Sequence, residues 1–241
     1  SYKKGEQVLN DISFNIEKGE QVAIVGATGA GKSTIVNLLT RFYEIQNGII
    51  EINGNNIKDI ELSFLRSKIA LVLQDVFLFA DTLLNNITLW DKDIPFKSVV
   101  DSAKKIGIHD FIMSLPNGYN YDVKERGVML SQGQRQLISF LRAYLKDPSI
   151  LILDEATSSI DSNFEELIQN AIKQITKNKT SIIIAHRLST IINSDKIFVM
   201  DYGKLVEYGT HRELISKEKG FYKNLYEVQF QKKSKLTQLQ S

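Results

Sequence analysis

The chain has 241 residues, which is enough to bury a substantial core, and α/β chains of this length often form one domain. Its 30 basic and 28 acidic residues leave a net charge of +2, which gives no electrostatic reason to expect nucleic acid or a strongly acidic partner. The absence of cysteine excludes disulfides and cysteine-ligated metals, and it fits a reducing compartment.

The sequence contains neither a membrane span nor a signal peptide. No apolar run approaches the roughly 20 residues that cross a bilayer, and the N-terminal residues 1–7 lack an apolar targeting segment. We therefore expect any membrane attachment to come through a partner or through a segment outside this sequence.

The opening third of the chain alternates apolar and polar residues. The alternation runs through residues 12–16 and 50–52, and turn signals follow at residues 18–19 and 53–54. This pattern predicts antiparallel strands on either side of the next motif.

That motif is GATGAGKST, which follows an apolar run at residues 21–25 and precedes apolar residues at helical spacing. Strand, glycine-rich loop and helix together predict a phosphate-binding loop, because successive backbone N–H groups and the helix N-terminus point at phosphate oxygens. The expected nucleotide contacts are Gly26, Ala27, Thr28, Gly29, Ala30, Gly31, Lys32, Ser33 and Thr34. Lys32 is expected to reach the β- and γ-phosphates, and the hydroxyl of Ser33 is expected to ligate Mg²⁺. A chance glycine-rich turn is the alternative, but all eight positions of the pattern match between the right elements.

Later apolar runs are continuous rather than alternating. They lie at residues 69–73, 150–153, 181–185 and 196–200, as expected for strands that are buried on both faces. Between residues 82 and 146 this strand pattern stops and apolar residues recur at helical spacing, notably around Val99 and Leu137. We expect a largely parallel central sheet with an inserted helical subdomain.

The C-terminal part begins with a predicted hairpin, FVMDYGKLVEYG, and a short helix is expected near residues 211–216. The last residues, 229–241, are polar enough that we expect a disordered tail.

Two acids, Asp154 and Glu155, stand at the C-terminal end of the buried strand 150–153, where open α/β sheets bind their ligands. We expect Asp154 to hold Mg²⁺ through its water shell and Glu155 to orient and polarise the water that attacks the γ-phosphate. An acidic strand end that only meets solvent is the alternative.

The stretch LSQGQ, residues 130–134, immediately precedes an amphipathic helix. Ser131 is the expected N-cap, and Gln134 three residues later completes a capping-box pattern, so a purely structural interpretation of both residues is available.

At this point the motifs resemble a known family. The L-S-x-G-Q signature together with both phosphate-binding motifs is similar to an ATP-binding cassette, or ABC, ATPase domain, and the resemblance covers nearly the whole chain. It implies a P-loop NTPase (RecA-like) α/β core, an antiparallel β subdomain and an inserted α-helical signature subdomain. The implied single domain has its core at residues 1–81 and 147–225 and its helical subdomain at 82–146.

The resemblance assigns further residues one at a time. Tyr2 matches the aromatic residue that stacks on adenine, Gln74 the glutamine that touches Mg²⁺ and the attacking water, and His186 the histidine that contacts the γ-phosphate. Asp161 lies in the matching D-loop at residues 158–161, and Ser131, Gly133 and Gln134 match the signature residues placed over the nucleotide of a second subunit. Each has a structural alternative: a surface tyrosine, a hydrogen-bonded strand glutamine and a structural histidine.

Gln132 is a departure from the family, which most often has glycine there. Close backbone approach is needed chiefly around Ser131 and Gly133, so we expect activity to survive.

Two short sequence motifs, Glu125-Arg126-Gly127 and AHRLST at residues 185–190, resemble those of exporter-type domains. The resemblance therefore implies Mg-dependent ATP hydrolysis in a head-to-tail dimer, and a transmembrane partner fused N-terminally in the full-length protein, at the cytoplasmic face of the membrane. It also implies a coupling surface within residues 74–86, where Phe77 and Phe79 are candidates with a core role as the alternative.

Two rival functions remain. A soluble ABC ATPase acting on nucleic acid or the ribosome is disfavoured, because the chain has no coiled-coil insertion, no second cassette and no basic stripe. A module that traps ATP without hydrolysis is disfavoured by the presence of Glu155 and His186.

Overall fold

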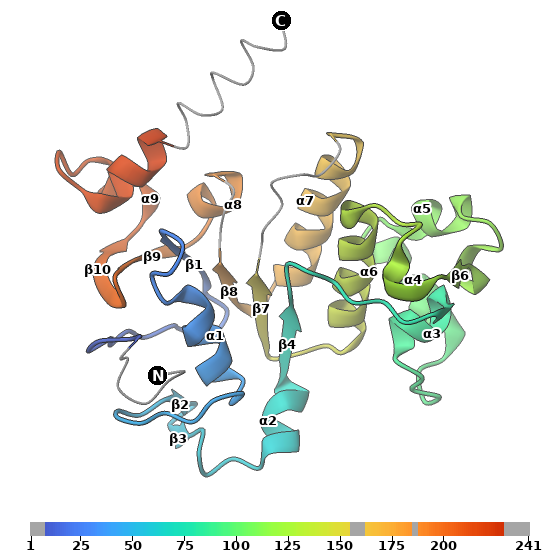
Figure 1. Ribbon diagram of the computed structural model, residues 1–241, viewed down its shortest axis with the longest axis horizontal. Coiled ribbons are helices and arrows are strands. Elements are labelled where there is room, and N and C mark those ends of the chain that lie inside the picture. Colours follow the sequence, from blue (N-terminus) through green and yellow to red (C-terminus); the bar gives the residue numbers. More distant parts are fainter. Residues whose placement is uncertain (1–7, 155–161, 185–187, 229–241) are drawn as a thin grey trace, which may run out of the picture. The chain divides into compact units, whose positions relative to one another are not determined.

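The computed structural model describes residues 8–154, 162–184 and 188–228 (Figure 1). The chain divides into two compact units, the first formed by Ser1–Arg66 with Thr180–Ser241 and the second by Ser67–Lys179. Each unit is described by itself below.

The first unit is built on strands in the order β10-β9-β1-β8. β1 (Gln21–Gly26) pairs in parallel with β8 (Thr180–Ile184) on one side and with β9 (Lys196–Asp201) on the other, while β10 (Lys204–Gly209) is antiparallel to β9. Residues 22–25 of β1 are buried, as their continuous apolar sequence predicts for a central parallel strand. The predicted strands at 181–185 and 196–200 and the C-terminal hairpin are confirmed.

Helix α1 (Lys32–Leu39) follows β1, and Figure 1 shows it in blue beside that strand. The short antiparallel pair β2 (Glu51–Ile52) and β3 (Asn55–Asn56) is joined by Asn53 and Gly54, both with positive φ, as the Asn-Gly turn signal predicts. This unit also contains α8 (Leu188–Ile192) and α9 (His211–Ile215), and residues 221–228 are helical.

The strand predicted at residues 12–16 is wrong. The segment has no strand assignment, although its alternation is real: Ile12, Phe14 and Ile16 are half-buried and the residues between them are exposed. Phe14 packs its ring on Phe198 of β9 with centroids 4.7 Å apart. Burial of alternate side chains therefore needs no hydrogen-bonded ladder here.

The second unit contains the parallel strands β4 (Ile69–Val72) and β7 (Ile150–Asp154), which confirm two further predicted strands. Helix α6 (Gln132–Leu145) is its main core element, with Leu137, Ile138 and Leu141 fully buried, and α7 (Ser162–Thr176) runs alongside it (Figure 1). Around them lie β5 (Asp81–Thr82), α3 (Leu83–Thr88), α4 (Phe96–Lys105), α5 (His109–Ser114), η1 (Gly118–Asn120), β6 (Asp122–Val123) and η2 (Glu125–Gly127). Helix α2 (Leu62–Lys68) runs across the division between the units.

The helical spacing predicted around Val99 and Leu137 is confirmed by α4 and α6. The finer division of the chain into core and helical subdomain stays a prediction. None of the helices in the described part of the chain is long and apolar enough to cross a membrane.

Candidate functional site

The phosphate loop connects β1 to α1 in the first unit. Its backbone turns through Gly26, Gly29 and Gly31, whose φ values of +151°, +83° and +99° lie in a region that side chains with a Cβ rarely adopt. At Gly26 a Cβ would also lie 2.2 Å from the carbonyl oxygen of Met200 in β9, a distance that no real Cβ tolerates. Glycine at 26 is therefore required both by the turn and by the adjacent strand.

Lys32 occupies the centre of this loop. Its side chain is only 7% exposed, and its Nζ donates hydrogen bonds to the carbonyl oxygens of Gly26 at 2.8 Å and Ala27 at 2.9 Å. The ammonium is thus held inside the loop that is predicted to surround the phosphates. We expect phosphate oxygens, which carry full negative charge, to compete with these carbonyls for it.

Residues around Lys32 complete the loop. The N–H groups of Lys32 and Ser33 belong to the first turn of α1, where no earlier helix carbonyl is available to them, so they are suited to an anion. The side chain of Ser33 is exposed, as a hydroxyl that ligates a metal must be, and the loop residues Ala27, Thr28 and Gly29 are exposed as well. Ala30 is buried and Thr34 half-buried.

The turn between β9 and β10 supports the loop from a distance in sequence, and sequence reasoning missed it. The N–H of Gly203 donates to the Ala30 carbonyl at 3.2 Å, and the Gly203 carbonyl accepts from the N–H of Asn10 at 2.7 Å. A Cβ at position 203 would lie 2.1 Å from the Val8 carbonyl oxygen. The only local signal was a Tyr-Gly turn, which says nothing about what the turn contacts.

The signature lies in the second unit at the start of α6. Ser131 is the N-cap: its Oγ accepts from the N–H of Gln134 at 3.2 Å, and its own N–H donates to Oε1 of Gln134 at 2.8 Å. The predicted capping box is confirmed. A hydroxyl that accepts one hydrogen bond still has its proton to donate, so the structural and functional interpretations of Ser131 are compatible.

Gln132 and Gly133 form the first turn of α6, so their N–H groups also precede any helix acceptor. Gly133 is buried and Gln132 is half-buried. Arg135, which follows them in α6, donates to the carbonyl oxygens of Gly127 and Leu130 and so ties the preceding Glu125–Gly127 turn to α6. The signature at residues 130–134 and the exporter-type motif at residues 125–127 are therefore joined by hydrogen bonds through Arg135.

We expect Gln132→Gly to change the rate of ATP hydrolysis only modestly, by about threefold or less, because position 132 contributes a side chain at the half-exposed edge of the first turn. Steady-state phosphate release by both chains at equal concentration checks this. A tenfold or larger gain or loss contradicts it and makes the Gln132 side chain part of the site.

Gln74 and Asp154 share one edge of the second unit. Val72 of β4 pairs with Leu153 of β7 in parallel register, so the segments leaving both strands start at the same end. Gln74 is exposed and Asp154 is half-buried. Their predicted roles toward Mg²⁺ and the attacking water stay predictions.

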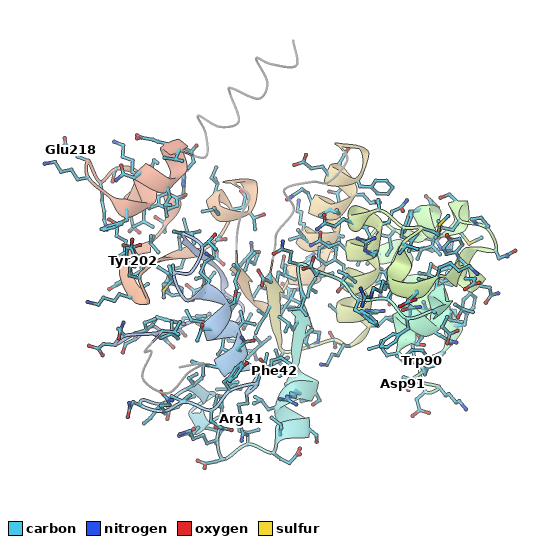
Figure 2. All side chains as sticks on the ribbon, in the orientation of Figure 1. Arg41, Phe42, Trp90, Asp91, Tyr202 and Glu218 are labelled. Atoms are coloured by element: carbon cyan, nitrogen blue, oxygen red, sulfur yellow. The ribbon has the colours of Figure 1, made fainter. Side chains whose placement is uncertain are left out.

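Phe77, Phe79 and Trp90 form a feature that we call the aromatic ledge. These side chains are 54%, 42% and 46% exposed, which rules out the core role considered for Phe77 and Phe79. Phe79 contacts Phe77 and Trp90 edge to face, with centroids 5.0 Å and 4.9 Å apart. Figure 2 labels Trp90 on the loop that follows α3. Phe77 and Phe79 belong to the segment 74–86 predicted to be the coupling surface, and Trp90 lies four residues beyond its end.

Asp81 holds Trp90 in place. Hydrogen bonds from the Asn85 side chain, the Thr82 N–H and the Trp90 indole N–H, the last at 2.8 Å, lower the pKa of the Asp81 carboxyl. The carboxylate therefore stays charged at neutral pH and the indole keeps its acceptor.

Several predicted site residues lie outside the described residues, namely Tyr2, Glu155, Asp161 and His186. Their roles in stacking on adenine, catalysis, contact across a dimer and contact with the γ-phosphate stay predictions.

The three residues predicted to ligate Mg²⁺, Ser33, Gln74 and Asp154, each carry a side-chain oxygen, the kind of ligand that this cation prefers. Among the residues that the structure describes, no group of three or more His, Cys, Asp or Glu side chains could hold a metal by itself.

Comparison with known proteins gives three findings. A family model described as "ABC transporter" matches residues 9–158, more than half of the chain. Multidrug export ATP-binding/permease proteins from Staphylococcus aureus strains NCTC 8325 / PS 47 and COL are each 52% identical over 222 residues. The match covers 92% of this chain and 38% of those relatives, so the chain spans well under half of their length. A solved structure of a bacterial Atm1-family ABC exporter with ATP bound is 41% identical with a TM-score of 0.88, covering 95% of this chain and 40% of that one.

Proposed function

The chain belongs to the ABC transporter family, and we propose that it is the nucleotide-binding domain of an exporter, hydrolysing ATP to drive transport across a membrane. One observation carries this: the same folded chain contains a phosphate loop with Lys32 held at its centre and a capped signature helix beginning at Ser131. The similar proteins that were named as exporters support the transport part of the proposal.

ATP binds with its phosphates in the loop from Gly26 to Thr34. The loop N–H groups and the Lys32 ammonium offset the charge of the β- and γ-phosphates, and Tyr2 stacks on the adenine. Ser33, Asp154 and Gln74 would hold Mg²⁺, which would neutralise charge that develops on the phosphate oxygens.

Glu155 is the residue that orients and polarises the attacking water, and His186 contacts the γ-phosphate. Gln74, which is exposed after β4, contacts the same water. These assignments rest on the motifs, since Glu155 and His186 lie outside the described residues.

Two copies of the domain share each ATP. The signature of one copy, with the Ser131 hydroxyl and the Gly133 N–H at the start of α6, covers the phosphates held by the loop of the other, and Gln134 and Asp161 lie at this contact. The hydrogen bonding of Ser131 supports this proposal. Its Oγ accepts from the Gln134 N–H, and the hydroxyl proton is left to donate to a phosphate. Hydrolysis removes the shared γ-phosphate and so reopens the dimer.

The partner of the domain is the membrane-embedded permease part of an exporter, which holds it at the cytoplasmic face. The relatives are called ATP-binding/permease proteins, and this chain covers 38% of them, which leaves more than half of their length for a permease. The exposed aromatic ledge, of which Phe77 and Phe79 closely follow Gln74 in sequence, is the surface on which that part docks.

Phosphate release by the unmutated chain, measured with Mg-ATP over a wide range of chain concentration, tests this function. If two chains complete each site, turnover per chain rises with concentration and then levels off as dimers saturate. Turnover that is constant over the whole range contradicts shared sites, and no release at any concentration contradicts the ATPase itself.

A further inference from the structure

The backbone of the aromatic ledge is hydrogen-bonded by the buried side-chain amide of Asn86. Asn86 in α3 is fully buried, and its Oδ1 accepts from the N–H of Phe79 at 2.8 Å. Its Nδ2 donates to the carbonyl oxygens of Phe79 and Thr82, both at 3.0 Å. One side chain thus bonds both backbone groups of Phe79, whose carbonyl oxygen also accepts from the N–H of Asp81 at 2.9 Å.

At Trp90, the other end of the ledge, the backbone has an energetically unfavourable conformation. Leu89 and Trp90 are consecutive non-glycine residues with φ values of +54° and +60°. Such residues rarely adopt this region, and they persist in it only where surrounding contacts determine the conformation. The Trp90 indole supplies such contacts through Asp81 and Phe79. The direction of the exposed ring is therefore specified by the fold.

Arg142 connects the ledge to the signature helix. It lies in α6, and its guanidinium donates through Nη1 to the Phe77 carbonyl oxygen at 3.0 Å, through Nη2 to Oδ1 of Asn86 at 3.1 Å, and through Nε to the Asn86 carbonyl oxygen. These partners are 65 and 56 residues away in sequence. Phe77 of the ledge and the buried Asn86 are thus both hydrogen-bonded to Arg142 of α6.

The guanidinium is suited to this task by its shape and charge. Burial lowers its pKa to about 10, so it is still protonated at neutral pH. Its acceptors on Phe77 and Asn86 are uncharged oxygens, and a charged donor strengthens bonds to them. Because its planar fork reaches separate acceptors in fixed directions, lysine at this position could not reproduce the arrangement.

We propose that Arg142 is a positioning residue, which fastens the aromatic ledge to the signature helix so that the two move as one body. Arg142 is eleven residues beyond Ser131 on the same helix, about 16 Å along its axis. Force on the ledge therefore reaches the first turn of α6 through the guanidinium and a rigid helix rather than through loops. The consequence for transport rests on the proposed function, since it requires a permease that docks on the ledge and a nucleotide that meets the signature.

Trp90 is the single tryptophan of the chain and therefore an intrinsic reporter of the ledge. In Arg142→Gln we expect quenching of Trp90 emission by acrylamide to increase about twofold, because the ledge opens locally without its fastening. Arg142→Lys, which keeps the charge without the fork, should fall between this variant and the unmutated chain.

Arg66→Gln is the matched control. Arg66 also donates to loop carbonyl oxygens, those of Thr40 and Arg41, but it belongs to the first unit. This variant should lose stability without changing Trp90 quenching. All spectra are taken well below the melting temperature of each chain.

A second readout separates positioning from stability. In Arg142→Gln the KM for Mg-ATP should stay within about twofold, since the phosphate loop is untouched, while turnover falls about fivefold because the signature end of α6 is less well placed. Arg66→Gln should move neither. This pattern, together with the Trp90 result, supports the inference.

Unchanged Trp90 quenching in both Arg142 variants, with melting temperatures lowered as in Arg66→Gln, overturns the inference and leaves Arg142 a residue that only stabilises the fold. If Arg142→Gln does not fold, Arg142→Lys decides by the same measurement. If the unmutated chain releases no phosphate, the proposed function fails, yet Trp90 quenching still decides whether Arg142 fastens the ledge.

Discussion

Lys32→Met abolishes nearly all ATP turnover, by about 100-fold or more, because it removes the one ammonium held at the centre of the phosphate loop. Methionine retains a long flexible side chain and removes the charge. The loss of turnover is therefore caused more by the missing charge than by a change in side-chain volume. The two carbonyls that bind Nζ also lose their donor, so binding of ATP should weaken in parallel. Phosphate release and equilibrium binding of ATP measure the two effects separately.

Lys146→Met is the control for this experiment. Lys146 is an exposed lysine whose Nζ likewise donates to a backbone carbonyl oxygen, that of Ile69 at 2.7 Å, but it follows α6 in the second unit. Its turnover should stay within about twofold of the unmutated chain. If Lys32→Met retains more than a tenth of the turnover, the phosphate-loop assignment of Lys32 is wrong.

Glu155→Gln should lower turnover by about 100-fold or more while leaving ATP bound, because the amide cannot polarise the attacking water as a carboxylate does. With hydrolysis blocked, Mg-ATP should hold two chains together, and the molar mass in solution should double when the nucleotide is added. Light scattering after size exclusion, with and without Mg-ATP, measures this.

Glu166→Gln, an exposed carboxyl in α7, is the matched control and should neither dimerise with ATP nor lose turnover. A Glu155→Gln chain that binds ATP and stays monomeric at high concentration shows that dimerisation needs a further segment or another partner. Gln132 in the signature is then the first position to change.

Local motifs were predictable because their causes lie within a few residues. The phosphate loop follows from glycines at fixed spacing between a strand and a helix, and the capping box of Ser131 and Gln134 follows from a separation of three residues. Continuous apolar runs in the sequence likewise predicted the buried strands β1, β4, β7, β8 and β9.

Features that depend on distant partners were not predictable in this way. The alternation at residues 12–16 specifies which side chains are buried, but not whether a neighbouring backbone is in place to form a ladder. Arg142 did leave a signal, since a charged residue stands between the buried Leu141 and Ala143. Nothing in the local sequence, however, names Phe77 and Asn86 as its partners.

The phosphate loop also shows that an evolutionary module and a folding unit need not coincide. The segment recognised as the family ends at residue 158, yet the carbonyl oxygen of Met200 fills the space beside Gly26, and Gly203 bonds the loop at Ala30. A fragment cut at the limits of the recognised segment would keep every residue of the motif and lose the neighbours that give the motif its shape. Grafting the motif onto another protein would therefore require transplanting the turn between β9 and β10 as well.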